Sequence, residues 1–394
     1  MGRPVVDLLD PDFYVGDPHP SYRWMREHEP VYRDEKNGLW AITRMEDVRT
    51  VERRSDVFVS SRGYRSVYTP PESSMISKDD PAHAEQRKLI SDRFTPRAVR
   101  RREAEIRELV VGCIERVRPY GVAEVAHALA ARIPATLTCR LLGFPDSDWV
   151  RMDDWSSKLM RIDTVLRDAG HLHDSMLAMI DLGEAARVLF EERRRTPRDD
   201  LMSVWAHSSL GGKPMRFETV HWELGLVVPG GVDTTRTTIS RSLILLAERP
   251  ELLAQMAKDP GVIPSAVEEL LRFITPLNNM FRSAAVDAEI GARKIPAGGR
   301  VCLLYPSANR DDAFFDQPDE IDFRRDPNPH VAFGLGSHFC LGANLARLTL
   351  RVFFEELAAR IERVEALAPP VYEANVFIKG VRRFDVRLHG GGSA

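Results

Sequence analysis

Apolar residues recur every three or four positions along most of the chain, the spacing that places them on one face of an α-helix. This pattern predicts helices at Glu103 to Val117, Trp149 to Leu166, His173 to Arg195, Glu218 to Ala247 and Pro250 to Lys258. Strand patterns are fewer, at Gly38 to Thr43, Glu289 to Ile295, Arg300 to Tyr305, and near Ala374 to Ile378 and Arg383 to Leu388. The turn at residues 296–299 is expected to join two of these strands as a hairpin. The chain is therefore predicted to be mainly α with a minor β portion, and residues 1–394 are expected to form a single domain.

The predicted helix at residues 218–247 would span on the order of 45 Å, the width of the whole molecule. Its middle, residues 229–235, reads P-G-G-V-D-T-T. Pro229 has no amide hydrogen to offer the carbonyl of Gly225, and the two glycines weaken the next turn, so we expect the helix to open there. Such a conflict inside a core helix indicates a candidate functional site. The alternative is a plain kink with Asp233 paired to a basic group.

Composition narrows the class of protein. The 394 residues are 43% hydrophobic and 29% charged with a formal net charge of -3, which is typical of a globular protein with a large core. A near-neutral charge gives no support for a nucleic-acid partner. Residues 1–32 contain no apolar run long enough for a signal peptide or a membrane span, so we expect no membrane span and a cytoplasmic location.

The four cysteines stand far apart and form no C-x-x-C pair, which argues against a zinc site or a disulfide framework. Cys113, Cys139 and Cys302 lie in apolar stretches and are expected to be buried. Cys340 differs, because it follows a glycine-rich turn and precedes an apolar helix. A helix start stabilises a thiolate through its amide donors and its dipole. On this segment alone, Cys340 is either a haem ligand or a nucleophile with His338 as its base.

Four segments together resemble motifs of the cytochromes P450. Residues 333–342, F-G-L-G-S-H-F-C-L-G, match the family's haem-binding signature, and residues 269–272, E-L-L-R, match its E-x-x-R motif. Residues 230–235, G-G-V-D-T-T, resemble its oxygen-activating stretch, and residues 80–83, D-P-A-H, followed by Arg87, resemble its haem-propionate helix. The four occur in the family's order. The resemblance implies the P450 fold, with the haem buried between the long central helix and the cysteine-bearing helix.

The resemblance implies a role for each matched residue around haem b, iron protoporphyrin IX. Cys340 is expected to be the axial thiolate ligand of the haem iron. Phe333, Gly334 and Gly342 belong to the signature loop, where glycine lets the backbone approach a flat ligand closely. The two haem propionates need cationic or donor groups. The family positions that supply these groups are occupied by His83, Arg87, Arg282 and His338.

The same resemblance assigns Asp233 and Thr234 to dioxygen activation. Thr234 is expected to hold water and dioxygen through its hydroxyl, and Asp233 to relay protons from the bulk, because the reaction consumes two protons. Pro229 departs from the usual pattern, in which an ordinary helix former precedes the small residue. A buried ion network that braces the haem-side core is expected from Glu269, Arg272 and Arg325.

The implied reaction is monooxygenation, in which one atom of dioxygen enters a C–H bond of a hydrophobic small molecule and the other leaves as water. The length leaves no room for a flavin domain, and no dinucleotide fingerprint is present, so a separate ferredoxin and ferredoxin reductase are expected as electron donors. A basic cluster near the Cys340 segment could steer an acidic partner. Its residues are Lys88, Arg93, Arg97, Arg100, Arg101 and Arg102. A merely solvated basic helix is the alternative.

Candidate substrate-pocket residues are mostly apolar, which suits a hydrophobic ligand. They lie in the loop 64–74, around Met160 and Met176, and at Val227, Gly230, Asn278, Asn279, Met280 and Phe377. The two asparagines could orient a hydroxyl or carbonyl group, or only cap a helix end. Residues 305–311, 325–334 and 340–347 are similar to actinobacterial members that hydroxylate sterol side chains and branched lipids. Terpenoids and secondary metabolites such as polyketides or peptides stay open as alternatives.

Three other functions stay open as well. A peroxygenase on the same fold would carry an arginine for a substrate carboxylate, whereas this chain has Asp233 and Thr234. A haem-thiolate binding protein or sensor would show no substrate-dependent oxygen consumption. A cysteine hydrolase using Cys340 and His338 would be isolated colourless.

Overall fold

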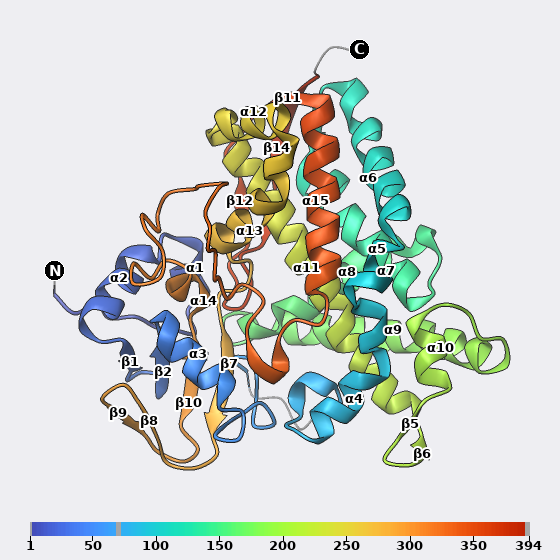
Figure 1. Cartoon of the computed structure of the whole chain (residues 1–394). Coiled ribbons are helices and arrows are strands. Elements are labelled where there is room, and N and C mark those ends of the chain that lie inside the picture. The colour runs from blue at the N-terminus through green and yellow to red at the C-terminus, as the bar shows by residue number, and fades with distance from the viewer. Residues whose placement is uncertain (1, 68–71, 391–394) are drawn as a thin grey trace.

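The structure is a computed structural model that describes residues 2–67 and 72–390, and helices make up most of it (Figure 1). The helices are α1 (Pro11–Val15), α2 (His19–His28), α3 (Met45–Arg53), α4 (Ala82–Ser91), α5 (Pro96–Arg100), α6 (Glu103–Val117), α7 (Arg132–Leu142), α8 (Trp149–Met160), α9 (Gly170–Arg195), α10 (Leu201–Ala206), α11 (Phe217–Glu248), α12 (Pro250–Lys258), α13 (Ile263–Ile274), α14 (Tyr305–Ala308) and α15 (Ala343–Arg360). The strands are β1 (Val31–Asp34), β2 (Leu39–Ile42), β3 (Phe58–Val59), β4 (Val122–Glu124), β5 (Ser209–Leu210), β6 (Lys213–Pro214), β7 (Met280–Ala284), β8 (Ala288–Ile290), β9 (Arg293–Ile295), β10 (Arg300–Leu303), β11 (Ile361–Ala366), β12 (Val371–Tyr372), β13 (Val381–Arg383) and β14 (Asp385–Gly390). The prediction of a mainly α chain with a minor β portion is confirmed.

Helix α11 is the central element and runs through the molecule beside α15 (Figure 1). Its first half, including Val220 and Val232, packs in an apolar cluster with α7, α8, α9 and α10. Its second half, including Ile239 and Leu243, packs in another cluster with α6, α12, α13 and α15. Because both halves are surrounded by apolar neighbours, the helix is buried on several sides. None of the helices in the described ranges combines the length and the apolarity needed to cross a membrane.

The main sheet has the strand order β1-β2-β10-β7-β3 and lies to one side of the helices (Figure 1). Strands β2 and β10 are parallel, and the other neighbours are antiparallel. Alternate residues of β10 point to opposite faces, as expected of a strand. Val301 and Leu303 join one apolar cluster, and Cys302 between them joins another. A second sheet pairs β11, β14 and β4. The main sheet carries Arg282, on β7, toward the candidate site.

The helix predictions hold better than the strand predictions. Helices α6 and α12 have the predicted bounds, whereas α8 ends at Met160 and a 3-10 turn follows. The predicted strand at residues 289–295 is wrong, because Gly291 turns the chain there and makes the hairpin β8–β9. The predicted hairpin at residues 296–299 is also wrong, since β10 pairs with β2 and β7 instead of β9. Residues 374–378 form no strand beyond a single bridge between Ile378 and Leu277.

The predicted opening of the central helix is also wrong. Helix α11 continues through Pro229 as one helix of 32 residues. Proline is therefore accommodated inside the helix, within the surrounding apolar packing, without breaking it.

Candidate active site

Cys340 lies in the loop between a 3-10 turn, Gly336–His338, and helix α15. Of the four cysteines it alone is exposed. Enclosure by the surrounding protein raises the pKa of its thiol above the usual value, although the Gly342 amide and the guanidinium groups of Arg87 and Arg347 act in the opposite direction. A coordinated metal ion deprotonates a thiol outright.

The loop before Cys340 requires glycine at two positions. Gly334 (φ 66°) and Gly336 (φ 71°) have left-handed backbone that favours glycine. A Cβ at Gly336 would lie 2.3 Å from the carbonyl oxygen of Glu52, so the loop packs directly against the end of α3. The Cys340 amide donates to the carbonyl oxygen of Phe333 at 2.9 Å. These contacts fix the position of the sulfur.

Three basic side chains from two distant segments, His83 and Arg87 on α4 and Arg282 on β7, converge on this loop, which itself carries His338. His83 and Arg87 lie one turn apart on α4, and the rings of His83 and His338 have centroids 4.1 Å apart. Arg87 donates to the carbonyl oxygen of Phe339 at 2.6 Å. Burial, followed by the charges of Arg282, His83 and Arg87, lowers the pKa of His338 to about 2. His338 is therefore neutral, and the arginines carry the positive charge.

Carboxylates balance only part of this cluster. Asp80 Oδ1 lies 3.0 Å from His83 Nδ1, and Glu52 Oε2 lies 3.4 Å from Arg282 Nη2. Within the described ranges, Arg87 has no carboxylate oxygen within the 4.0 Å of an ion pair. One unpaired guanidinium and several N–H donors thus surround the cysteine loop, an arrangement that suits an anionic ligand.

The middle of α11 faces open space. Gly230 is exposed although Val228 and Val232 beside it are buried, and a Cβ at Gly230 would meet nothing within 4 Å. The Thr234 hydroxyl donates to the carbonyl oxygen of Gly230 at 2.9 Å. Leu341, the residue after the cysteine, packs against the apolar cluster that contains Val228 and Val232. Leu341 thus shares an apolar cluster with this part of the helix.

The Asp233 side chain contacts α8. Its carboxylate accepts a hydrogen bond from Ser156 Oγ at 2.7 Å and lies 3.5 Å from Arg236 Nη1. Burial raises the pKa of Asp233 to about 6, although Arg236 and Ser156 lower it. A carboxyl group with this pKa exchanges protons near neutral pH, as a general acid or base must.

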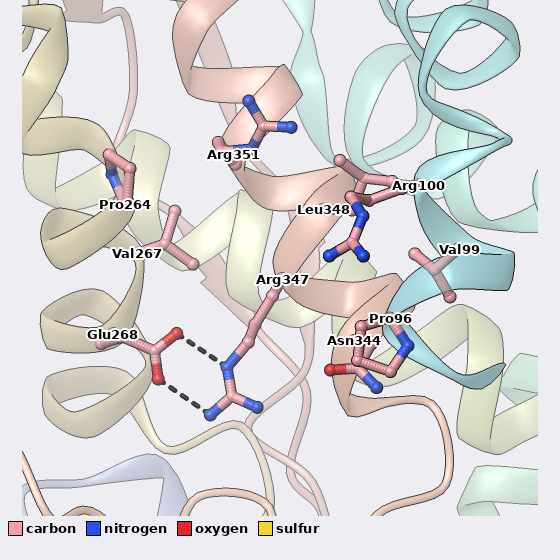
Figure 2. A pocket seen from close by; sticks show the side chains of 10 residues that line it. All are labelled: Pro96, Val99, Arg100, Pro264, Val267, Glu268, Asn344, Arg347, Leu348 and Arg351. Carbon is pink, nitrogen blue, oxygen red and sulfur yellow. Dashed lines mark hydrogen bonds and ion pairs between the residues drawn. The ribbon is translucent and has the colours of Figure 1, made fainter.

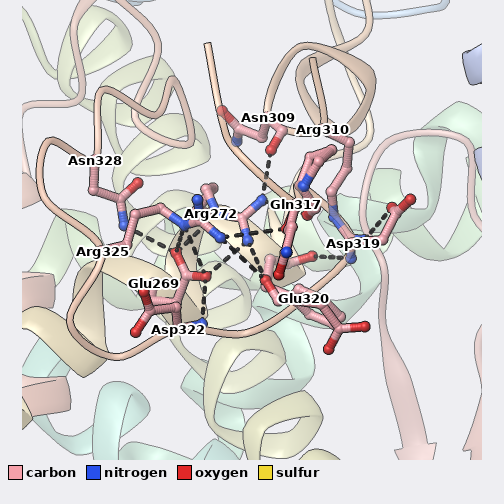
Figure 3. A network of polar contacts seen from close by, with 12 residues as sticks. Glu269, Arg272, Asn309, Arg310, Gln317, Asp319, Glu320, Asp322, Arg325 and Asn328 are labelled. Carbon is pink, nitrogen blue, oxygen red and sulfur yellow. Dashed lines mark hydrogen bonds and ion pairs between the residues drawn. The ribbon is translucent and has the colours of Figure 1, made fainter. Parts of the chain in front are cut away.

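Glu269 on α13 is the centre of a buried ion network (Figure 3). Its two carboxylate oxygens accept hydrogen bonds from Arg272 at 2.7 and 2.8 Å, and Arg325 Nε donates to it at 3.1 Å. Arg272 is fully buried. Its other hydrogen bonds go to the carbonyl oxygens of Asn309, Pro318 and Glu320. The structure thus brings the three predicted network residues together and ties α13 to the loop 309–325.

A small apolar cluster lies apart from the larger cores and contains several of the candidate pocket residues. Its members are Met160, Leu277, Met280, Phe377 and Ile378. The guanidinium of Arg65 lies 4.6 Å over the ring of Phe377 and is bound to buried Asp163. Met176 does not contribute, because it is exposed on α9. Val227 is half-buried on α11. In the candidate loop 64–74, residues 68–71 lie outside the described residues.

Asn278 and Asn279 are placed differently from the expectation of a substrate contact. Both are fully buried. Their side-chain amides donate to the carbonyl oxygen of Val376 at 3.2 and 2.9 Å, and that of Asn278 also donates to Asn375. Helix α13 already ends at Ile274, so neither asparagine caps it. They hold the 375–376 segment in place, and no open space adjoins them.

Comparison with known proteins identifies the family. A family model described as Cytochrome P450 matches residues 162–360. A steroid C26-monooxygenase of Mycobacterium tuberculosis is 34% identical over 388 residues, which is 97% of this chain and 97% of that protein. The chain belongs to the cytochrome P450 family.

Further relatives of this P450 agree with the assignment. A methyl-branched lipid omega-hydroxylase of Mycobacterium bovis is 35% identical over 361 residues, covering 89% of this chain and 84% of that protein. The structure of a Mycobacterium marinum cytochrome P450 in complex with pseudoionone superposes with a TM-score of 0.90 at 32% identity, covering 98% of this chain and 99% of that one. The expected P450 fold and monooxygenase class are confirmed.

The cofactor of this family is haem b, and the residues of this P450 fit it. A haem needs an iron ligand, space for a flat macrocycle, and donors for two propionates. Cys340 is an exposed sulfur on a glycine-fixed loop, and a Cβ at Gly230 on the central helix would meet nothing within 4 Å. His83, Arg87, Arg282 and His338 supply donors at the cysteine loop. The described residues therefore supply the iron ligand and the donors for the propionates.

Several residues that shape this P450 site escaped the sequence motifs. Ser60 contacts His338 Nε2 at 3.2 Å, and Glu52 pairs with Arg282. No local signal marks either, because their partners lie more than 200 positions away. Arg236 could have been found, since it stands three residues after Asp233 on a helix and therefore on the same face. Its second partner, Asp153, could not.

Proposed function

We propose that this P450 inserts one oxygen atom into a C–H bond of a hydrophobic small molecule with a sterol, terpenoid or branched-chain skeleton, using electrons from a separate ferredoxin and ferredoxin reductase. One observation carries the proposal: an exposed cysteine on a glycine-fixed loop lies among basic side chains that suit an anionic ligand, in a chain whose long central helix has an open middle.

Cys340 would hold the haem iron through its sulfur. Bound there, haem supplies the iron at which dioxygen is reduced. The glycine loop holds the sulfur in position, and Arg87, Arg282, His83 and His338 would bind the propionates. The two histidines would bind as hydrogen-bond donors, while the arginines would supply charge.

Thr234 and Asp233, on α11, would deliver the protons that the reaction consumes. The Thr234 hydroxyl donates to the carbonyl of Gly230, beside the open space, so it is placed to hold a water molecule there. Asp233 lies one position earlier and faces buried polar groups of α8, so it is placed to bring protons from that side. The Thr234 hydroxyl would donate a proton on the side of the substrate, and the Asp233 carboxyl would then replace that proton.

The apolar cluster around Phe377 and Met280 supports a hydrophobic substrate. Two relatives are named for a steroid and a methyl-branched lipid, which are apolar molecules. The buried ion pair of Arg65 and Asp163 lies against Phe377 at one edge of this cluster, so a polar group of the substrate is expected at that edge only.

A basic face near the cysteine supports docking of an acidic electron donor. Lys88, Arg97, Arg100 and Arg101 are exposed and make no ion pair among the described residues, whereas Arg93 pairs with Asp199. A pocket of about 300 Å³ opens beside them (Figure 2). Its walls include Val99 and Leu348, with the guanidinium groups of Arg100 and Arg351 at the rim. The unpaired Arg97, Arg100 and Arg101 would attract carboxylates of the donor.

The test is a ligand screen on haem-loaded protein. Sterols, terpenoids and branched fatty acids would be titrated while the Soret band is followed, and the best binder would be incubated with a surrogate ferredoxin, reductase and NADPH. We expect a spectral shift, substrate-dependent oxygen consumption and a hydroxylated product. Cys340→Ser should lose the red-shifted Soret band of the reduced carbon monoxide complex.

The outcomes separate the alternatives. Ligand binding without oxygen consumption would indicate a sensor or binding protein. Product formation from hydrogen peroxide alone, at the rate seen with the full donor chain, would indicate a peroxygenase. Colourless protein with a thiol that reacts with alkylating agents would indicate a hydrolase.

A further inference from the structure

Arg236 on α11 lies between two buried carboxylates. Its Nη1 atom is 3.1 Å from Asp153 Oδ1 and 3.5 Å from Asp233 Oδ1. The side chains of Arg236, Asp153 and Asp233 are 10%, 13% and 9% exposed. Two carboxylates thus share one cation away from bulk water. The carboxylate that lies nearer to the cation has its ionised form stabilised more strongly.

Helix α8 holds the guanidinium at the Asp153 side. Ser157 Oγ accepts a hydrogen bond from Arg236 Nη1 at 2.8 Å, beside the 3.1 Å contact with Asp153. Ser156, also on α8, donates its hydroxyl hydrogen to the second oxygen of Asp233 at 2.7 Å. Consecutive residues of one helix therefore anchor the cation and solvate the carboxylate that faces it.

We propose that Asp153 is a positioning residue for proton delivery in this P450: it draws Arg236 away from Asp233 and so leaves the Asp233 carboxyl free to exchange protons. The proposal rests on the proposed role of Asp233 as the proton carrier. Asp153 itself acts only through the position of Arg236 and through its own negative charge.

The surrounding charges support this assignment. Burial raises the pKa of Asp233 to about 6, Arg236 and Ser156 lower it, and the negative charges of Asp153 and Glu373 raise it. Burial also raises the pKa of Asp153, against the effect of Arg236. The further titratable groups that face this cluster are Arg161, which pairs with Glu373, and His127, whose Nε2 lies 3.5 Å from Arg236 Nη2.

Removing the charge of Asp153 has two effects on Asp233, and they have the same sign. Arg236 loses its nearer partner and can approach Asp233, and the repulsion from a neighbouring carboxylate disappears. Both changes stabilise ionised Asp233 and lower its pKa. An opposite charge at contact distance lowers a carboxyl pKa by about 1–3, so the protonated fraction at pH 7 should fall about 10-fold or more.

The experiment compares Asp153→Asn with Asp154→Asn in haem-loaded protein. Asp154 is the next residue on α8, but it is exposed and pairs only with Lys158 in the described structure, so the control changes the same net charge nearby. The infrared C=O band of protonated Asp233, assigned by its loss in Asp233→Asn, is titrated without turnover. The pH profile of product formed per NADPH is measured separately.

We expect the midpoint of the Asp233 band to move to lower pH in Asp153→Asn and to stay unchanged in Asp154→Asn. At pH 7, product formation in Asp153→Asn should fall about 10-fold, while substrate binding measured by the Soret shift persists. In Asp153→Glu, which keeps the negative charge, the midpoint of the Asp233 band should lie close to that of the parent protein. An Asp233 midpoint that is the same in Asp153→Asn and the parent overturns the proposal.

Two further variants keep the test decisive. If Asp153→Asn does not fold, the midpoint of the Asp233 band is measured in Arg236→Gln and in the double variant Arg236→Gln with Asp153→Glu. Because both variants lack the shared cation, the two midpoints should agree. A difference between them counts against the proposal. Unchanged turnover in Asp233→Asn would instead refute the proton-carrier role, whatever the infrared titration shows.

Discussion

The Glu269 network gives the sharpest prediction about stability. Glu269→Gln keeps the volume of the side chain and one acceptor oxygen, but it leaves the fully buried guanidinium of Arg272 without a counter-charge. Breaking one partner of a buried ion pair costs about 3–5 kcal/mol. Arg325 loses the same partner, although it is more exposed.

The expected change in melting temperature follows from the size of the chain. Unfolding entropy is about 2.1 cal/mol/K per residue, so for 394 residues each kcal/mol corresponds to roughly 1.2 °C. Glu269→Gln should therefore lower the Tm of the haem-loaded protein by about 4–6 °C at pH 7, measured by calorimetry or circular dichroism. Although burial raises the pKa of Glu269, the hydrogen bonds and charge of Arg272 lower it overall. The loss should therefore be complete above pH 4.5 and shrink as the pH falls below that value.

A matched control lies in the same network. Glu320 offers its carbonyl oxygen to Arg272, but its side chain is 65% exposed and reaches Arg249 only at 3.6 Å. Glu320→Gln should cost less than about 1 kcal/mol, because exposed ion pairs contribute little. Equal losses of stability in the two variants, or no loss in Glu269→Gln, would refute the argument that burial makes the loss of Glu269 costly to stability.

Three other predictions concern single side chains. Thr234→Ala removes the hydroxyl beside Gly230 and should raise hydrogen peroxide release per NADPH several-fold with unchanged substrate affinity, measured by a peroxide assay. Burial raises the pKa of Glu223 to about 7, so the folded state loses stability as the pH rises from 4.5 toward 7. Glu223→Gln should therefore raise the Tm by about 2–4 °C at pH 8 but not at pH 4.5. Gly336→Ala places a Cβ against the Glu52 carbonyl in a left-handed backbone, so it should cost more than about 2 kcal/mol and reduce haem content after gel filtration.

Long helices of this P450 could be predicted closely from the sequence, because apolar periodicity is a local property. Helices α6 and α12 have the predicted bounds, and α11 differs by one residue at each end. The strands were less predictable, since short strands owe their existence to distant partners. Strand β10 was itself predicted, but its pairing with β2 and β7, from residues 39–42 and 280–284, was not. No pattern within residues 296–303 reveals those neighbours.

The candidate site divides in the same way. Cys340, Glu269 and Arg272 belong to short motifs whose spacing determines their geometry, so they could be named in advance. The carbonyl partners of Asn278 and Asn279 could not be predicted, because sequence position alone does not tell whether a polar side chain meets a cavity or a neighbouring carbonyl group. The Asp153 contact was not predictable, since nothing in the sequence of α8 indicates which residue of α11 it faces.

The four basic side chains around Cys340 that would bind the haem propionates have a consequence for biosynthesis. These side chains, at positions 83, 87, 282 and 338, are separated by up to about 250 residues of chain, and contacts of such long range form late and slowly during folding. A porphyrin dianion that binds only the finished arrangement stabilises it by mass action. The yield of native protein in a host should therefore rise with the supply of haem precursor during expression, and protein made under haem starvation should be the fraction most readily cut by proteases.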